Sequence, residues 1–116
     1  MPSTDRVLSR SVFDHALHDD PLDPGTILAG HPTTALAELA DLADPAFTSV
    51  GLWEITEGTV TDVEADEIFV VLSGRCTLTV EGDGSWQLEP GMVVRLHAGE
   101  RTVWEVHERL RKIYLA

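Results

Sequence analysis

The sequence of 116 residues contains little sulfur and little positive charge. Cys76 is the only cysteine, so no disulfide can form within one chain, and a lone cysteine in a strand-like stretch is expected to be a small buried hydrophobic residue. Eight Lys and Arg residues stand against twenty Asp and Glu residues, and the net charge of −12 repels phosphate backbones and anionic lipid surfaces. We therefore expect neither a nucleic acid nor a membrane as a partner.

Long hydrophobic runs are also missing. Nowhere do about 18 apolar residues follow one another, as a membrane-spanning helix requires, and the first residues contain no continuous apolar stretch of signal-peptide length. We therefore expect a cytoplasmic protein. The length and the 43% hydrophobic composition fit one globular domain with one core.

The first part of the chain, residues 1–47, differs from the rest and predicts an irregular and partly helical appendage. Leu36, Leu39 and Leu42 recur at helical spacing, which predicts a helix over residues 33–44. Thr34 can cap its start, and Asp44 before Pro45 marks its end, because a residue before proline avoids the helical region. A further helical turn is expected within residues 11–20.

The second part, residues 48–116, predicts a β-barrel. Short β-rich runs alternate with turn residues at nearly regular intervals, which is typical of a sandwich or barrel. No helix of crossover length interrupts them, so a parallel α/β sheet is excluded. The eight expected strands lie near residues 49–56, 58–63, 67–73, 75–81, 85–89, 92–97, 101–107 and 110–115.

Two segments of this region resemble the two motifs of the cupin family. Gly58, Glu67 and Gly74 occupy the outer glycine, the glutamate and the closing glycine of the first motif, and Gly91 and Gly99 fit the glycines of the second. The runs GLWEITEG, DEIFVVLSGRCTLT, LEPG and TVWEVHERLRKIYL further resemble small single-domain cupins related to the cupin domain of (S)-ureidoglycine aminohydrolase. The resemblance implies an all-β, cupin-type double-stranded β-helix, or jelly-roll barrel, after the short helical appendage.

The same motifs imply a degenerate metal site. Carrying over the ligand positions of metal-dependent cupins gives Thr61, Val63, Glu67 and Thr102, and a valine with two neutral hydroxyls and one carboxylate makes a poor site for a transition metal. We expect no metal ligands and no cofactor, with displaced ligands for a divalent metal as the alternative. Glu64 is expected in a solvated turn, and Lys112 in exposed pairs at the C-terminal tail.

Glu67 is the candidate catalytic residue. Strand alternation places it on one face with Phe69, so its carboxylate is expected to enter an apolar barrel, where desolvation raises the pKa and suits a general acid or base. A structural glutamate bonded to backbone or to Thr102 is the alternative. The side chains expected to bind a ligand around it are those of Trp53, Thr61, Phe69, Thr102 and Trp104.

Three functions remain open at this point. The first is a cupin that binds or transforms a small molecule in its barrel without a motif-type metal site. The second is a metal-dependent enzyme similar to the aminohydrolase, and the third is a non-catalytic stabilising or regulatory domain. Exposed strand edges favour association, so we expect a homodimer with a small-molecule ligand.

Overall fold

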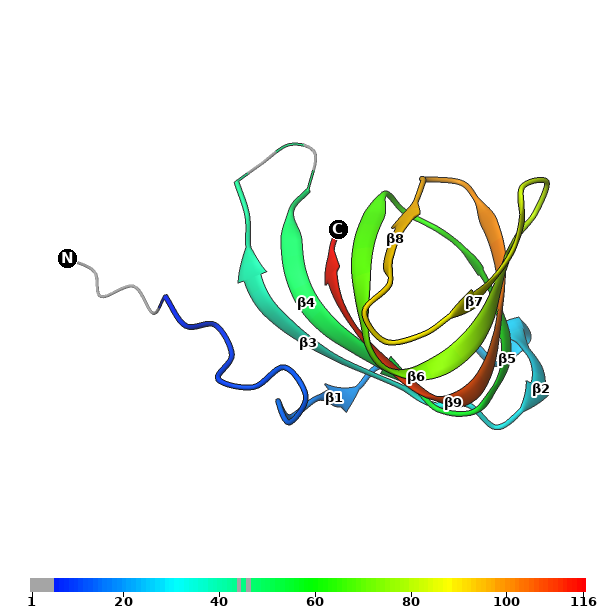
Figure 1. Cartoon of the computed structure of the whole chain (residues 1–116), viewed down its shortest axis with the longest axis horizontal. Helices are drawn as coiled ribbons and strands as arrows, with labels where there is room; N and C mark the ends of the chain where they lie inside the picture. The colour runs from blue at the N-terminus through cyan, green and yellow to red at the C-terminus, as the bar shows by residue number, and fades with distance from the viewer. Residues whose placement is uncertain (1–5, 44, 46) are drawn as a thin grey trace.

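The structure, a computed structural model, describes residues 6–43, 45 and 47–116. It is built from nine strands in one antiparallel sheet: β1 (His18–Asp19), β2 (Ile27–Gly30), β3 (Thr34–Asp41), β4 (Ser49–Ile55), β5 (Gly58–Val63), β6 (Glu67–Val80), β7 (Gly84–Leu88), β8 (Val93–Leu96) and β9 (Arg101–Leu115). A single turn of 3₁₀ helix, η1 (Pro24–Thr26), precedes β2. The sheet curls on itself (Figure 1), and the expected all-β class is confirmed.

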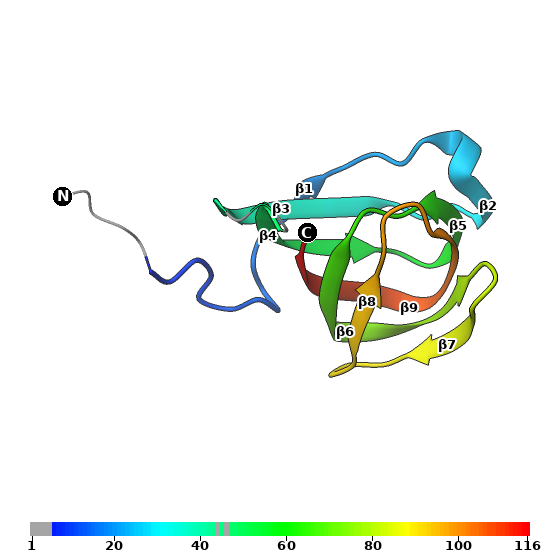
Figure 2. The ribbon, with the colours of Figure 1, turned by 90° about the horizontal axis from the view of Figure 1, so that it is seen from above.

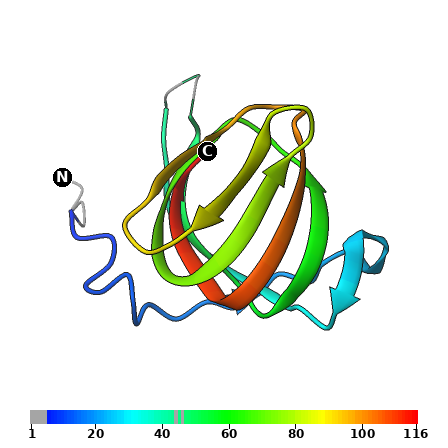
Figure 3. The same ribbon diagram turned by 45° about the vertical axis from the view of Figure 1, so that its right-hand side comes forward.

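The two long strands β6 and β9 form the spine of the curl. They pair with each other along most of their length, as Figure 3 shows, and each pairs with two shorter strands on its other side. The first half of β9 pairs with β5 and the second half with β4, whereas β6 pairs with β8 and then with β7. Figure 2 shows β7 at one end of the curl and β1 and β3 at the opposite end.

The eight expected strands of residues 48–116 become six, because β6 and β9 each join two of them. The turns expected at residues 73–74 and 107–109 are irregularities within these two paired strands. The β6–β9 register shifts three times between Val71 and Cys76, and Gly74 has a φ of 90°. Such bulges bend a strand without ending it, so turn-forming residues mark bends here.

The helix expected over residues 33–44 is wrong. Thr34–Asp41 form β3, which pairs with β4, while Asp44 lies outside the described residues. A register shift between Glu38 and Ala40 inserts one residue into the strand alternation. The backbone pairing with β4 overrides the helix propensity of Ala, Leu and Glu, which is a weak preference.

The expected helical turn within residues 11–20 is a single turn. The Ser11 carbonyl accepts hydrogen bonds from the amides of Asp14 and His15, and the chain then runs as β1 along β3. The described residues include no α-helix and hence no helix long and apolar enough to cross a membrane. The boundary at residue 47 between the expected appendage and the expected barrel stays a prediction. Three strands that precede it, β1, β2 and β3, belong to the same sheet as the later strands.

The core fills the inside of the curl. Its buried side chains come mainly from β6 and β9, and they include Phe69, Leu78, Trp104 and Leu110. Cys76 is buried among them, and desolvation raises the pKa of its thiol to about 12. The expectation of a small, buried hydrophobic cysteine is confirmed.

Candidate functional site

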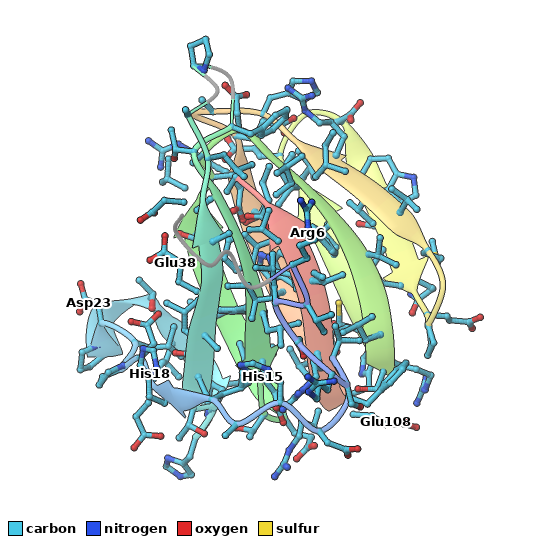
Figure 4. The ribbon with its side chains drawn as sticks, turned by 90° about the vertical axis from the view of Figure 1, so that its left-hand side faces the viewer. Arg6, His15, His18, Asp23, Glu38 and Glu108 are labelled. Carbon is cyan, nitrogen blue, oxygen red and sulfur yellow. The ribbon has the colours of Figure 1, made fainter. Side chains whose placement is uncertain are left out.

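A cavity of about 380 Å³ opens at the side of the curl that β3, β4, β5 and β9 enclose. Three aromatic side chains border it, together with five carboxylates and one amine. These are Trp53, Trp104 and Tyr114; Asp20, Asp23, Asp62, Glu64 and Glu67; and Lys112. Figure 4 shows Asp23 on the N-terminal segment beside the sheet, and this segment forms part of the cavity lining.

The polar centre of the cavity is an ion pair between Lys112 on β9 and Glu67 at the start of β6. Lys112 Nζ donates a hydrogen bond to Glu67 Oε2 over 2.5 Å. The side chains are only 7% and 13% exposed. A desolvated pair of opposite charges interacts far more strongly than a surface pair, and each member depends on the other for its burial.

Three aromatic rings surround the Lys112 ammonium. Its nitrogen lies 4.6 Å from the ring centroid of Trp53, 4.3 Å from that of Phe69 and 5.0 Å from that of Trp104. Aromatic faces attract cations through the ring quadrupole, most strongly where water is absent. Lys112 is therefore held as a buried cation by one carboxylate and by an aromatic box consisting of Trp53, Phe69 and Trp104.

Glu64 is a second buried carboxyl group beside this box. Its Oε2 accepts hydrogen bonds from Thr102 Oγ1 at 2.6 Å and from Trp104 Nε1 at 3.1 Å. Desolvation raises the pKa of Glu64, the Thr102 hydrogen bond opposes this, and the charge of Asp62 adds to it, with a net shift upward. A carboxyl group with a raised pKa can hold and release a proton nearer neutral pH.

The raised pKa of Glu64 predicts a pH dependence of stability. The folded protein retains a proton that the unfolded chain releases, so the free energy of unfolding falls as pH rises from the usual glutamate pKa through the raised one. Replacing Glu64 by glutamine removes this contribution. Urea denaturation at a series of pH values should show Glu64→Gln gaining stability relative to the unchanged protein across that window, and a difference independent of pH would contradict the assignment.

The structure brings most of the sequence-predicted residues together. Trp53, Glu67 and Trp104 border the cavity, and Phe69 lies under Lys112 as one wall of the box. Thr102 is buried and reaches the site through Glu64. Their functional roles stay predictions.

Thr61 reaches the edge of the cavity, but its hydroxyl donates to the Thr26 carbonyl oxygen at 3.4 Å. It therefore contacts the N-terminal segment as well as the cavity. Its role as a ligand-binding residue also stays a prediction.

Two residues of the site were placed wrongly by sequence reasoning. Lys112 was expected in an exposed pair and Glu64 in a solvated turn, yet both are buried. Alternation along β9 could have revealed Lys112, because it follows the fully buried Leu110 by two residues. Glu64 carries no comparable signal, since its burial depends on Thr102 and Trp104 from a distant strand.

The residues present do not fit a motif-type metal ion. Val63 is 61% exposed, and the strand register places Val60 and Asp62, rather than Thr61 and Val63, opposite Trp104 and Thr102. The Lys112 ammonium already pairs with Glu67. In the part of the chain that the structure describes, no three His, Cys, Asp or Glu side chains are grouped so that they could hold a metal ion.

Comparison with known proteins identifies the fold independently. A family model described as the EutQ-like cupin domain matches residues 43–114. The EutQ protein of Clostridium difficile has a similar structure, with a TM-score of 0.65 and 23% identity over 83% of this chain and 74% of that one. No curated protein matches the chain.

Two further solved structures share the fold. A protein of unknown function of the DUF861 family from Pseudomonas syringae has a TM-score of 0.75 and 24% identity, over 88% of this chain and 44% of that one. The cupin domain of Cnp3 from Schizosaccharomyces pombe has a TM-score of 0.68 and 17% identity, over 95% of this chain and 73% of that one. At these identities the likeness concerns the fold, and the resemblance to the aminohydrolase stays a prediction.

Proposed function

Because the chain belongs to the EutQ-like cupin family, whose fold encloses a barrel interior, we propose that it binds a small polar molecule in its cavity without a metal ion. One observation carries the proposal: the buried pair of Lys112 and Glu67 borders a cavity of about 380 Å³ instead of being sealed inside the core. Ligand pockets of roughly 300–1,000 Å³ with apolar walls and a few placed polar groups are typical of small-molecule sites.

The polar groups of the cavity complement a ligand that carries oxygen or hydroxyl groups. An ammonium has three donors, and Glu67 accepts one of them, which leaves Lys112 able to donate to a ligand oxygen. Glu67 and Glu64 supply acceptors beside it. Trp53 and Trp104 offer flat apolar surfaces against which the carbon skeleton of the ligand can pack.

The charge around the cavity favours neutral or cationic ligands. Asp20, Asp23 and Asp62 are exposed at its border, in addition to the buried Glu64 and the partly buried Glu67. Lys112 is the single positive side chain among the residues that line the cavity. A ligand with a carboxylate or phosphate would meet like charge on entering.

Intrinsic fluorescence provides a test that reports on the cavity. Of the three tryptophans, Trp53 and Trp104 border the cavity and Trp86 is an exposed residue away from it, so the Trp86→Phe variant confines the signal to the site. Screening neutral polyols, amines and carboxylates should identify neutral or cationic compounds that change the fluorescence. At about 100 times its Kd such a compound should raise the free energy of unfolding by about 2.7 kcal/mol.

The matched variants separate binding from general effects. Trp53→Leu, made in the Trp86→Phe background, should lose the fluorescence response to the compound. The Trp86→Phe variant alone should keep the stabilisation that the compound provides. If no compound of any charge stabilises the protein, the alternative of a non-catalytic stabilising domain gains support, with Lys112 merely filling its aromatic box. Preferential binding of carboxylates would contradict the proposed charge selectivity.

A further inference from the structure

Lys112 is the only lysine in the chain, which has seven arginines. The other described ion pairs use Arg75, Arg95, Arg109, Arg111 or His97, none of which lines the cavity. A guanidinium would supply a positive charge equally well, but it stays protonated and does not form imines with simple aldehydes or ketones. The one basic side chain at the cavity is thus also the one that can act as an amine nucleophile.

The surroundings of Lys112 contain the groups that amine chemistry needs. Glu67 Oε2 lies 2.5 Å from Nζ and can accept the ammonium proton. Glu64 lines the same cavity as Lys112, and its carboxyl feels the charge of the ammonium, so it can donate and recover a proton during the reaction. The aromatic box helps to leave the Lys112 side chain only 7% exposed, and desolvated lysines are the ones that enzymes use to form Schiff bases.

We propose that Lys112 forms an imine with a small neutral aldehyde or ketone bound in the cavity. The inference rests on the proposed function, because the carbonyl compound must first enter the same cavity. The carboxylates at its border disfavour a keto acid, so the substrate class is a neutral carbonyl compound.

The atoms and charges of this step balance. Glu67 takes a proton from the ammonium, the free amine pair forms the N–C bond, and the pair of the C=O π bond moves to oxygen, which Glu64 protonates. The nitrogen, now with four bonds, gives a second proton to the Glu64 carboxylate. The hydroxyl then takes the proton that Glu67 holds and leaves as water, while the freed nitrogen pair closes the C=N bond. In total the ammonium gives two hydrogens to the oxygen, so a lysine cation and a carbonyl compound yield a protonated imine and water, without an oxidant or reductant.

Reductive trapping tests the step at a single residue. The folded protein is incubated with propionaldehyde or, separately, with anionic glyoxylate, in the presence of cyanoborohydride, and its peptides are analysed by mass spectrometry. Only Lys112 and the α-amino group can be labelled, so the α-amino group is an internal control. We expect propionaldehyde to label Lys112 at least as fast as the α-amino group, and glyoxylate to label it more slowly.

Two variants define the chemistry. Lys112→Arg should lose all side-chain labelling while it keeps the positive charge, and the α-amino group should be labelled as before. Glu64→Gln, which keeps an acceptor for Thr102 and Trp104, should slow the labelling of Lys112 by about 100-fold without affecting the α-amino group. Equal rates at Lys112 in Glu64→Gln and in the unchanged protein would overturn the role of Glu64 in the step.

The labelling and fluorescence experiments distinguish two cases: one in which Lys112 forms no imine, and one in which the cavity binds no ligand at all. Labelling of Lys112 only in denatured protein would overturn the imine, even if compounds still change the Trp86→Phe fluorescence. Absence of both labelling and any fluorescence response would overturn the proposed function as well. Faster labelling by glyoxylate would overturn the assigned substrate class.

Discussion

Replacing Lys112 by methionine is expected to lower the free energy of unfolding by about 3–5 kcal/mol. Methionine keeps most of the packing against the aromatic box, so the loss comes from Glu67, whose 13% exposed side chain would be left with its charge buried and without the Lys112 partner. Urea denaturation near neutral pH measures the change.

An exposed ion pair supplies the matched control. Arg75 and Glu108 are 49% and 61% exposed, and Arg75→Met should cost about 1 kcal/mol or less. The double variant Lys112→Met with Glu67→Leu should recover most of the stability, because apolar replacement of both partners of a buried pair is often neutral. Equal costs for Lys112→Met and Arg75→Met would contradict the burial of the Lys112–Glu67 pair.

Replacing Gly74 by alanine is expected to cost at least about 4 kcal/mol, or to prevent folding. An added Cβ would lie 2.0 Å from the Arg109 carbonyl oxygen and 2.7 Å from Leu110 Cα. These are backbone atoms of the paired strand β9, which cannot yield as a side-chain tip can. The φ of 90° adds the strain of a left-handed conformation. Circular dichroism and denaturation of the purified variant measure the effect.

Gly82 is the control for backbone strain alone. Its φ is 80°, and nothing lies within 4 Å of an added Cβ, so Gly82→Ala should cost only about 1–2 kcal/mol. Similar costs at Gly74 and Gly82 would show that β6 and β9 do not meet as closely as the bend requires.

The fold was predictable from the sequence because two kinds of signal agreed in residues 48–116. Turn residues at Gly82 and Gly91 lie beside the ends of β7 and β8, and the cupin motif glycines follow in the same order. The motif glycine Gly74 was expected in a turn, yet it lies within a continuous strand against Arg109. Local sequence shows that a chain must bend there, but the pairing of β6 with β9 decides whether the strand ends.

The site was only partly predictable because burial depends on distant strands. Glu67 and Trp104 were found through the motif and its neighbouring runs, and both border the cavity. Lys112 was missed because lysine in a charged C-terminal run is usually exposed, whereas three rings from β4, β6 and β9 enclose it here. Glu64 was missed for the same reason, since its partner groups come from β9.

The metal-ligand positions that the motif assigned to β5 are displaced by one residue from the positions that face the interior. Counting along the motif assigned Thr61 and Val63 to the inner face, but the pairing of β5 with β9 places Val60 and Asp62 opposite Trp104 and Thr102. A shift of one residue exchanges the two faces of a strand. Motif spacing alone therefore could not show which side chains of β5 face the interior.

The most direct test of the account is nuclear magnetic resonance of protein labelled with ¹³C and ¹⁵N in lysine only. Since Lys112 is the single lysine, one set of side-chain resonances reports on the centre of the cavity. We predict that ring currents of Trp53, Phe69 and Trp104 shift its ε-methylene protons well upfield, and that a cavity ligand moves them further. Resonances at the positions of an exposed lysine, unchanged by every compound that the protein binds, would contradict a functional site built around Lys112.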